Sequence, residues 1–140
     1  MYNLDTVSEL PLYRLYILRA SFLVLGVAQG SQTWYVIIRH AKHWDFWHGV
    51  GLCFLGALTA LALLGVRYPV RMIPLMLFEL AWKLLWALVV WLPQWLAHNV
   101  DPDTADNAFS IILGVVVVPL ILPWGYVWRH YVIAPADRWR

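Results

Sequence analysis

A glutamate and a lysine stand one helical turn apart inside an apolar stretch of the sequence, residues 75–86, which reads LMLFELAWKLLW. Glu79 and Lys83 have the i,i+4 spacing with the acid first, the favourable order for an ion pair on one helix. In hydrocarbon an unpaired charge costs about 2.5–3.5 kcal/mol, so we expect the two side chains to pair. Ionisable residues in such a stretch indicate either a proton-coupling or substrate site, or a structural pair that fixes the register of the helices.

Polar and aromatic residues elsewhere could complete a site around this pair. The first apolar segment contains QGSQT, in which Gln29 lies about as deep as Lys83 lies in the third segment. In the fourth segment Pro119 has no N–H, which frees the carbonyl of Val115 at a similar depth. Two tryptophans beside the pair are too deep to be interfacial anchors, so we expect them to pack around it. The residues of this candidate site are Glu79, Lys83, Gln29, Gln32, Trp82 and Trp86.

A second group of residues could bind a metal. It consists of His40, His43, Asp45, His48 and His98, around the first loop and the end of the third apolar segment. Imidazole and carboxylate groups could hold zinc or another divalent ion, and His48 with His98 could bridge a haem. The spacing matches no tight ligand motif, and histidine at the headgroup level also serves as an amphipathic anchor. No cofactor is therefore predicted, and the metal or haem site stays an alternative.

The composition indicates a membrane protein. Of the 140 residues, 62% are hydrophobic and 13% charged, whereas about a quarter of a soluble domain is charged. A membrane-spanning helix needs roughly 20 apolar residues. Four segments meet this requirement: residues 20–38, 46–66, 72–96 and 108–128. We predict an all-α protein with a single integral membrane domain, residues 1–140.

Charge and short loops predict the arrangement of these segments. Of the ten lysines and arginines, seven fall on one side of the predicted membrane: Arg14, Arg19, Arg67, Arg71, Arg129, Arg138 and Arg140. The other side has Arg39 and Lys42. By the positive-inside rule both termini are cytoplasmic, and short loops favour an antiparallel bundle of four helices.

Small and helix-breaking residues add local expectations. Gly26-x-x-x-Gly30 predicts close helix approach, and a second group of small residues occurs in the next segment. That group is Gly49, Gly51, Gly56 and Ala60. Asp103, with Asp106 three residues later, is the expected N-cap of the fourth segment. Pro119 and Pro123 are expected to interrupt that segment in its inner half.

Several functional classes find no support in the sequence. Cys53 is the only cysteine, so there is no disulfide framework, and as an isolated thiol it is given no role. No stretch rich in lysine and arginine indicates a nucleic-acid partner. No Ser/His/Asp set, phosphate loop or carboxylate cluster indicates a catalytic site, which argues against an enzyme.

The second and third segments resemble the DoxX-like group of small four-span bacterial inner-membrane proteins. The resemblance rests on LALLGVRYPVRMIPLMLFEL, with Gly65 and Arg67 at the inner turn and Glu79 in the following segment. WKLLW and the proline-rich VVPLILPWGYVWRHYV depart from that group's general pattern. The resemblance implies a four-span fold in the inner membrane and respiratory or redox membrane partners. It carries over no catalytic residue.

Three functions follow as hypotheses. The first is a non-enzymatic accessory subunit that binds partners or membrane lipids, with Glu79 and Lys83 as a structural pair. The second is a small oligomeric proton-coupled transporter or channel that uses Glu79, although Lys83 would neutralise that acid. The third is metal or haem binding on the outer face. A homo-oligomer or a larger membrane complex is compatible with the first two.

Overall fold

The computed structural model describes residues 10–39 and 43–137 of the chain. All regular structure in these residues is helical. Four helical segments are long and apolar enough to cross a membrane: Leu12–Arg39, Phe46–Arg67, Ile73–Leu96 and Pro102–Ile121. The prediction of an all-α chain with four such segments is confirmed, and the chain has the helices of a multi-pass membrane protein.

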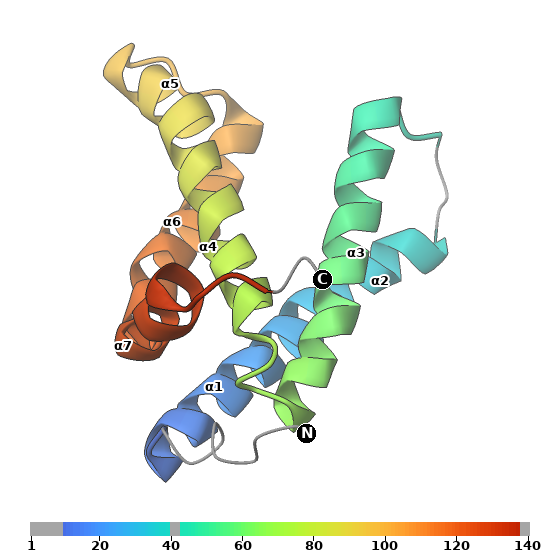
Figure 1. Ribbon diagram of the computed structural model, residues 1–140. Coiled ribbons are helices and arrows are strands. Elements are labelled where there is room, and N and C mark those ends of the chain that lie inside the picture. The colour runs from blue at the N-terminus through green and yellow to red at the C-terminus, as the bar shows by residue number, and fades with distance from the viewer. Residues whose placement is uncertain (1–9, 40–42, 138–140) are drawn as a thin grey trace. The chain divides into compact units, whose positions relative to one another are not determined.

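The chain divides into two compact units. The first contains Met1–Ile73 and Pro123–Arg140, and the second contains Pro74–Leu122. Figure 1 labels the helices of both units in chain order. The unit boundaries fall at the start of the third apolar segment and at the end of the fourth.

The first unit pairs the first two apolar segments. Its elements are α1 (Leu12–Val24), the π-helical turn η2 (Leu25–Gln29), α2 (Gly30–Arg39) and α3 (Phe46–Arg67). The first three follow one another without a break and lie along α3 (Figure 1). Asp45 caps α3, because its side chain accepts a hydrogen bond from the backbone N–H of His48.

Glycines set the spacing of this helix pair. A β-carbon at Gly26 would lie 2.5 Å from the Leu63 side chain, and one at Gly30 would lie 3.3 Å from Thr59. At the end of α3 the ring of the fully buried Phe22 occupies the place of a Gly65 side chain. The close approach predicted from Gly26-x-x-x-Gly30 is therefore confirmed within the chain.

The second unit pairs the third and fourth apolar segments. Its elements are α4 (Ile73–Trp86), the π-helical turn η3 (Ala87–Trp91), α5 (Leu92–Leu96) and α6 (Pro102–Ile121). The π-helical turn comes just before Pro93, which has no N–H to continue the regular hydrogen-bond ladder. In this unit α6 packs against η3.

The start of α6 differs from the expectation. Asp101, rather than Asp103, is the N-cap, so the earlier assignment is wrong. Asp101 accepts hydrogen bonds from the backbone N–H of Thr104 at 3.0 Å and from its hydroxyl at 2.6 Å. Pro102 suits the first helical position, because its missing N–H would be unpaired there anyway. The helix consequently begins at residue 102, two positions before the start that a cap at Asp103 predicts, and the apolar segment from residue 108 lies inside it.

The end of α6 also differs from the predicted segment, which ran to residue 128. The predicted interruption is wrong at Pro119, through which the helix continues, and is confirmed before Pro123, because the helix stops at Ile121. Leu122 is extended because Pro123 follows it, and a residue before proline avoids the helical conformation. A new short helix, α7 (Trp124–Val127), then leads into the π-helical segment η4 (Trp128–Ile133) of the first unit.

Candidate functional site

The candidate site is built on α4, around a buried carboxylate. Leucine, methionine, alanine, glutamate and lysine dominate this stretch and favour helix, which puts Glu79 and Lys83 on one face. Glu79 is 1% exposed. Its Oε1 lies 2.7 Å from Nζ of Lys83, whose side chain is 12% exposed. The two opposite charges are thus in direct contact in a largely buried place.

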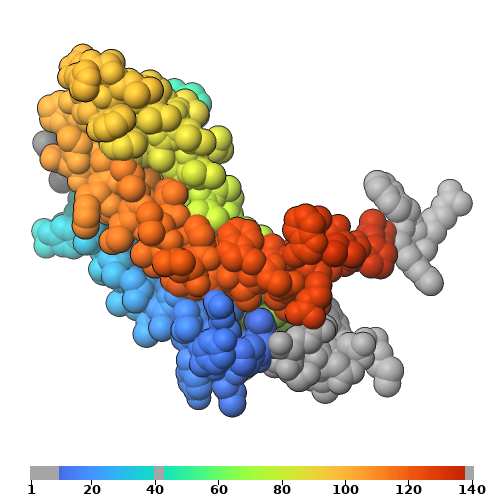
Figure 2. All heavy atoms as spheres, turned by 90° about the vertical axis from the view of Figure 1, so that its left-hand side faces the viewer, coloured from blue at the N-terminus to red at the C-terminus, as the bar shows by residue number. Residues whose placement is uncertain are grey.

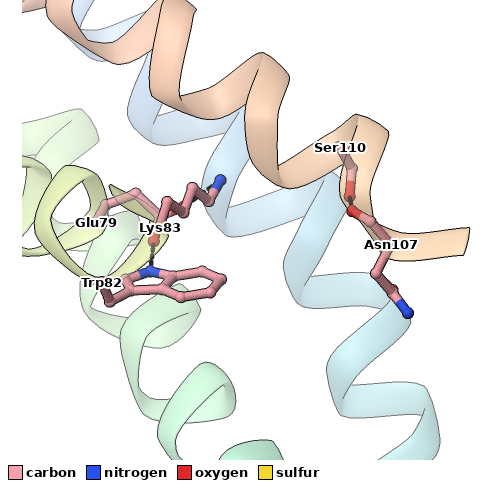
Figure 3. A network of polar contacts seen from close by, with 5 residues as sticks. All are labelled: Glu79, Trp82, Lys83, Asn107 and Ser110. Carbon is pink, nitrogen blue, oxygen red and sulfur yellow. Dashed lines mark hydrogen bonds and ion pairs between the residues drawn. The ribbon is translucent and has the colours of Figure 1, made fainter. Parts of the chain in front are cut away.

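A tryptophan supplies the second partner of the carboxylate. Nε1 of Trp82 donates a hydrogen bond to Oε2 of Glu79 (Figure 3). In the described part of the chain, Oε1 accepts no hydrogen bond of regular geometry, so the ion pair with Lys83 is its partner. The ammonium of Lys83 also lies 5.6 Å from the Trp82 ring centroid, within cation–π range. We refer to Glu79, Trp82 and Lys83 as the α4 charge cluster.

The lysine of this cluster lies against a glycine of α6. Figure 3 shows the Lys83 side chain extending from α4 with its amine directed away from that helix. A β-carbon at Gly114 would lie 2.6 Å from Nζ and 2.8 Å from Cδ of Lys83. Any side chain at position 114 would therefore displace the lysine. Gly114 makes room for the cation beside the α6 backbone.

Gly114 was not predicted as part of the site, although its position in the sequence is distinctive. It is the only glycine between residues 102 and 121, in a run otherwise rich in leucine, isoleucine and valine. It also directly precedes Val115, whose carbonyl cannot receive a hydrogen bond from Pro119. Two other polar residues of α6, Asn107 and Ser110, bond to backbone carbonyls of their own helix.

The remaining residues of the predicted site fall in different places. Trp86 is half-buried on α4, one turn beyond Trp82. Gln29 is half-buried in η2 and Gln32 is exposed on α2, both in the first unit. Their place beside Lys83 stays a prediction.

The predicted metal ligands do not form a ligand set in the described residues. His40 lies outside the described residues, and His43 and His48 are exposed. The Asp45 carboxylate is engaged as the cap of α3. His98 lies in the turn after α5 with a φ of 52°. Within residues 10–39 and 43–137, no three histidines, cysteines or acids come together as metal ligands.

Fold and site together define a class: an α-helical protein of multi-pass type that carries a buried charge cluster with internal partners. No protein-family model, curated protein or solved structure matches the chain. The function must therefore be inferred from this chain's own residues.

Proposed function

We propose that this chain is a non-enzymatic integral membrane protein that works by binding partners or lipids, as an accessory subunit does. In this proposal the α4 charge cluster is structural and holds α4 in register with α6. One observation carries it. Both oxygens of Glu79 have partners within the cluster, and Lys83 fills a space that Gly114 leaves for it. Partners for both oxygens within one helix, together with a fitted place for the lysine, favour a structural role for the pair over one in proton transfer.

An apolar face of α6 supports the binding role. Its exposed residues recur at helical spacing along one side of α6, the helix whose atoms are coloured orange in Figure 2. They are Phe109, Leu113, Val116 and Leu120. A face of this kind suits lipid chains or a partner's apolar helix.

The proposed topology is an antiparallel four-helix bundle in a bacterial inner membrane, with both termini cytoplasmic. The uneven distribution of arginine and lysine supports the orientation. The contacts of the first unit support antiparallel neighbours, because Phe22 meets Gly65 whereas Trp34, later in the first helix, meets Gly56, earlier in α3. The inner membrane and respiratory or redox partners follow from the DoxX-like resemblance.

Removing one or both charges tests the structural role. Glu79→Gln and Lys83→Met each leave one buried charge unpaired, which is expected to lower the free energy of unfolding by about 3–5 kcal/mol. The double variant removes both charges at similar volume and should regain most of that loss. Thermal unfolding of the four proteins in a neutral detergent measures both effects.

The transporter hypothesis predicts a different result. If Glu79 carries protons, Glu79→Gln remains folded and inserted, but proton flux into liposomes containing a pH-sensitive dye disappears. A fully stable Glu79→Gln protein that has lost a flux shown by the wild type would overturn the structural proposal.

A further inference from the structure

A small pocket in the first unit has a strongly basic lining. It lies where α1 meets the end of α3 and the turn that follows, and its volume is about 230 Å³. Arg19 comes from α1, Arg67 ends α3, and Arg71 and Tyr68 belong to the turn. We call this the arginine pocket. Its cationic groups come from two separate parts of the sequence, which the fold brings together.

One of these arginines has an unused donor. Nε of Arg19 is buried and has no hydrogen-bond partner in the described part of the chain. A buried donor without a partner is uncommon, because leaving it unpaired costs about 1–3 kcal/mol. A ligand in the pocket that accepts a hydrogen bond would remove this cost.

The other two arginines are arranged around an aromatic ring. The guanidinium carbons of Arg67 and Arg71 lie 5.4 and 5.7 Å from the Tyr68 ring centroid. These cation–π contacts restrict both side chains beside the pocket. Guanidinium groups held in place lose less rotamer freedom when they bind an anion.

The rest of the lining is apolar. Leu15 and Pro69 are buried, and Val70 is half-buried. The pocket therefore combines cationic donors with a hydrocarbon wall. This combination fits a ligand that has both an anionic head and an apolar body.

We propose that the arginine pocket binds a phosphate group, and that its occupant is the headgroup of an anionic phospholipid. Planar guanidinium groups match the geometry of phosphate oxygens and bind them through paired hydrogen bonds. All three arginines fall on the side that the positive-inside rule makes cytoplasmic, where basic pockets at helix ends bind acidic lipids. The proposal concerns a site separate from the α4 charge cluster and does not depend on that cluster's role.

The test compares lipids with the same acyl chains and different headgroups. Purified wild-type protein in a neutral detergent receives phosphatidylglycerol, phosphatidylcholine or inorganic phosphate alone. Bound lipid is counted by native mass spectrometry, and melting temperature is measured in parallel. We expect phosphatidylglycerol to bind and to raise the melting temperature more than phosphatidylcholine does. Inorganic phosphate alone is expected to give a smaller effect.

Variants locate the binding in the pocket. Arg19→Gln and Arg67→Gln should each weaken phosphatidylglycerol binding about fivefold, the effect of one arginine at an anionic surface. Arg19→Lys keeps the charge but removes Nε, so it should also bind phosphatidylglycerol more weakly than the wild type. Because this variant retains the positive charge, it serves as a second test if Arg19→Gln does not fold. Arg39→Gln is the matched control, because it removes the same charge from an exposed residue at the end of α2. It should bind as the wild type does.

The outcomes separate the ligand source from the site itself. Inorganic phosphate alone could give the full stabilisation, and the Arg19 and Arg67 variants could lose it. That result would support the phosphate site and assign it to a free anion. Equal binding of the two lipids by the wild type would overturn the proposal. So would Arg19 and Arg67 variants that bind phosphatidylglycerol as tightly as Arg39→Gln.

Discussion

The amine of Lys83 on α4 occupies the space that a side chain at position 114 of α6 would need, with only 2.6 Å between Nζ and the place of a β-carbon. A buried lysine is thus matched to a glycine on a second apolar helix of the same unit. The match explains how the charge lies inside the unit while Glu79 neutralises it from its own helix. It also makes the ion pair dependent on a residue that carries no side chain.

Gly114→Ala should destabilise the protein through Lys83. The added methyl group meets both the amine and the Cδ atom of the lysine, so the outer part of that side chain must shift beside Glu79. Overpacking of this kind costs about 1–3 kcal/mol, and a flexible lysine favours the lower part of that range. The melting temperature in neutral detergent should fall accordingly.

A double-mutant cycle assigns that loss to the lysine. In a Glu79→Gln/Lys83→Ala background the methyl group at position 114 meets no lysine side chain. There Gly114→Ala should be neutral, or stabilising by up to about 1 kcal/mol, because alanine is the better helix former. The same loss in both backgrounds would show that Lys83 is not what Gly114 accommodates.

Trp82→Phe should weaken the cluster without altering its charges. The phenyl ring keeps most of the apolar contact but lacks the N–H that bonds to Oε2 of Glu79. A hydrogen bond to a charged group is worth about 1.5–3 kcal/mol, so the free energy of unfolding should fall by that amount. Unfolding in neutral detergent, followed by far-UV circular dichroism, measures it.

Trp86→Phe is the matched control for this change. Trp86 is a half-buried tryptophan one turn further along α4, and the same substitution there removes the same atoms. A smaller loss at position 86 than at position 82 is expected. Equal losses would mean that ring size, rather than the bond to Glu79, determines the effect.

Gly65→Ala should disrupt the pairing of α1 with α3. The β-carbon would overlap the ring of Phe22, which is fully buried and cannot swing into open space. We expect a loss of about 1–3 kcal/mol, with reduced yield of folded protein in detergent. Gly51→Ala in the same helix provides the comparison, because nothing lies within 4 Å of a β-carbon there. A Gly65→Ala protein as stable as Gly51→Ala would contradict the observed packing.

Hydropathy and helix spacing predicted much of the fold because they are local properties. The second and third segments were located to within about one residue of the observed helices. In the fourth segment the break before Pro123 was predicted correctly, whereas the interruption at Pro119 and the cap at Asp103 were not, because Asp101 rather than Asp103 caps the helix. Asp101 caps the helix through two hydrogen bonds from Thr104, one from its backbone N–H and one from its hydroxyl. The rule used for Asp103 looks only for an acid three residues after the cap, so it does not detect this threonine.

Only the part of the site that lies on one helix, α4, was predicted from the sequence. The i,i+4 rule places Glu79 and Lys83 together, and Trp82 follows from adjacency on the same helix. Gly114 is 31 positions beyond Lys83 in the sequence, and only tertiary packing brings the two together. The arginine pocket was not predicted for the same reason. Its three arginines indicate from sequence only which side of the membrane is cytoplasmic, and tertiary packing brings them together around one pocket.

The cap of α6 provides a prediction on pH dependence. Hydrogen bonds from the Thr104 side chain and then its backbone hold the pKa of Asp101 below its usual value of 3.8. Because the pKa is lower in the folded protein, the carboxylate stabilises the fold fully above pH 3.8 and loses this effect as the pH falls through the folded pKa. Asp101→Asn keeps an acceptor for the backbone N–H but has no charge to lose. The wild type should therefore have the higher melting temperature at pH 6, and the difference should shrink as the pH falls below 3.8. Asp103→Asn tests the competing position, and a larger pH-dependent loss there would assign the cap to Asp103 instead.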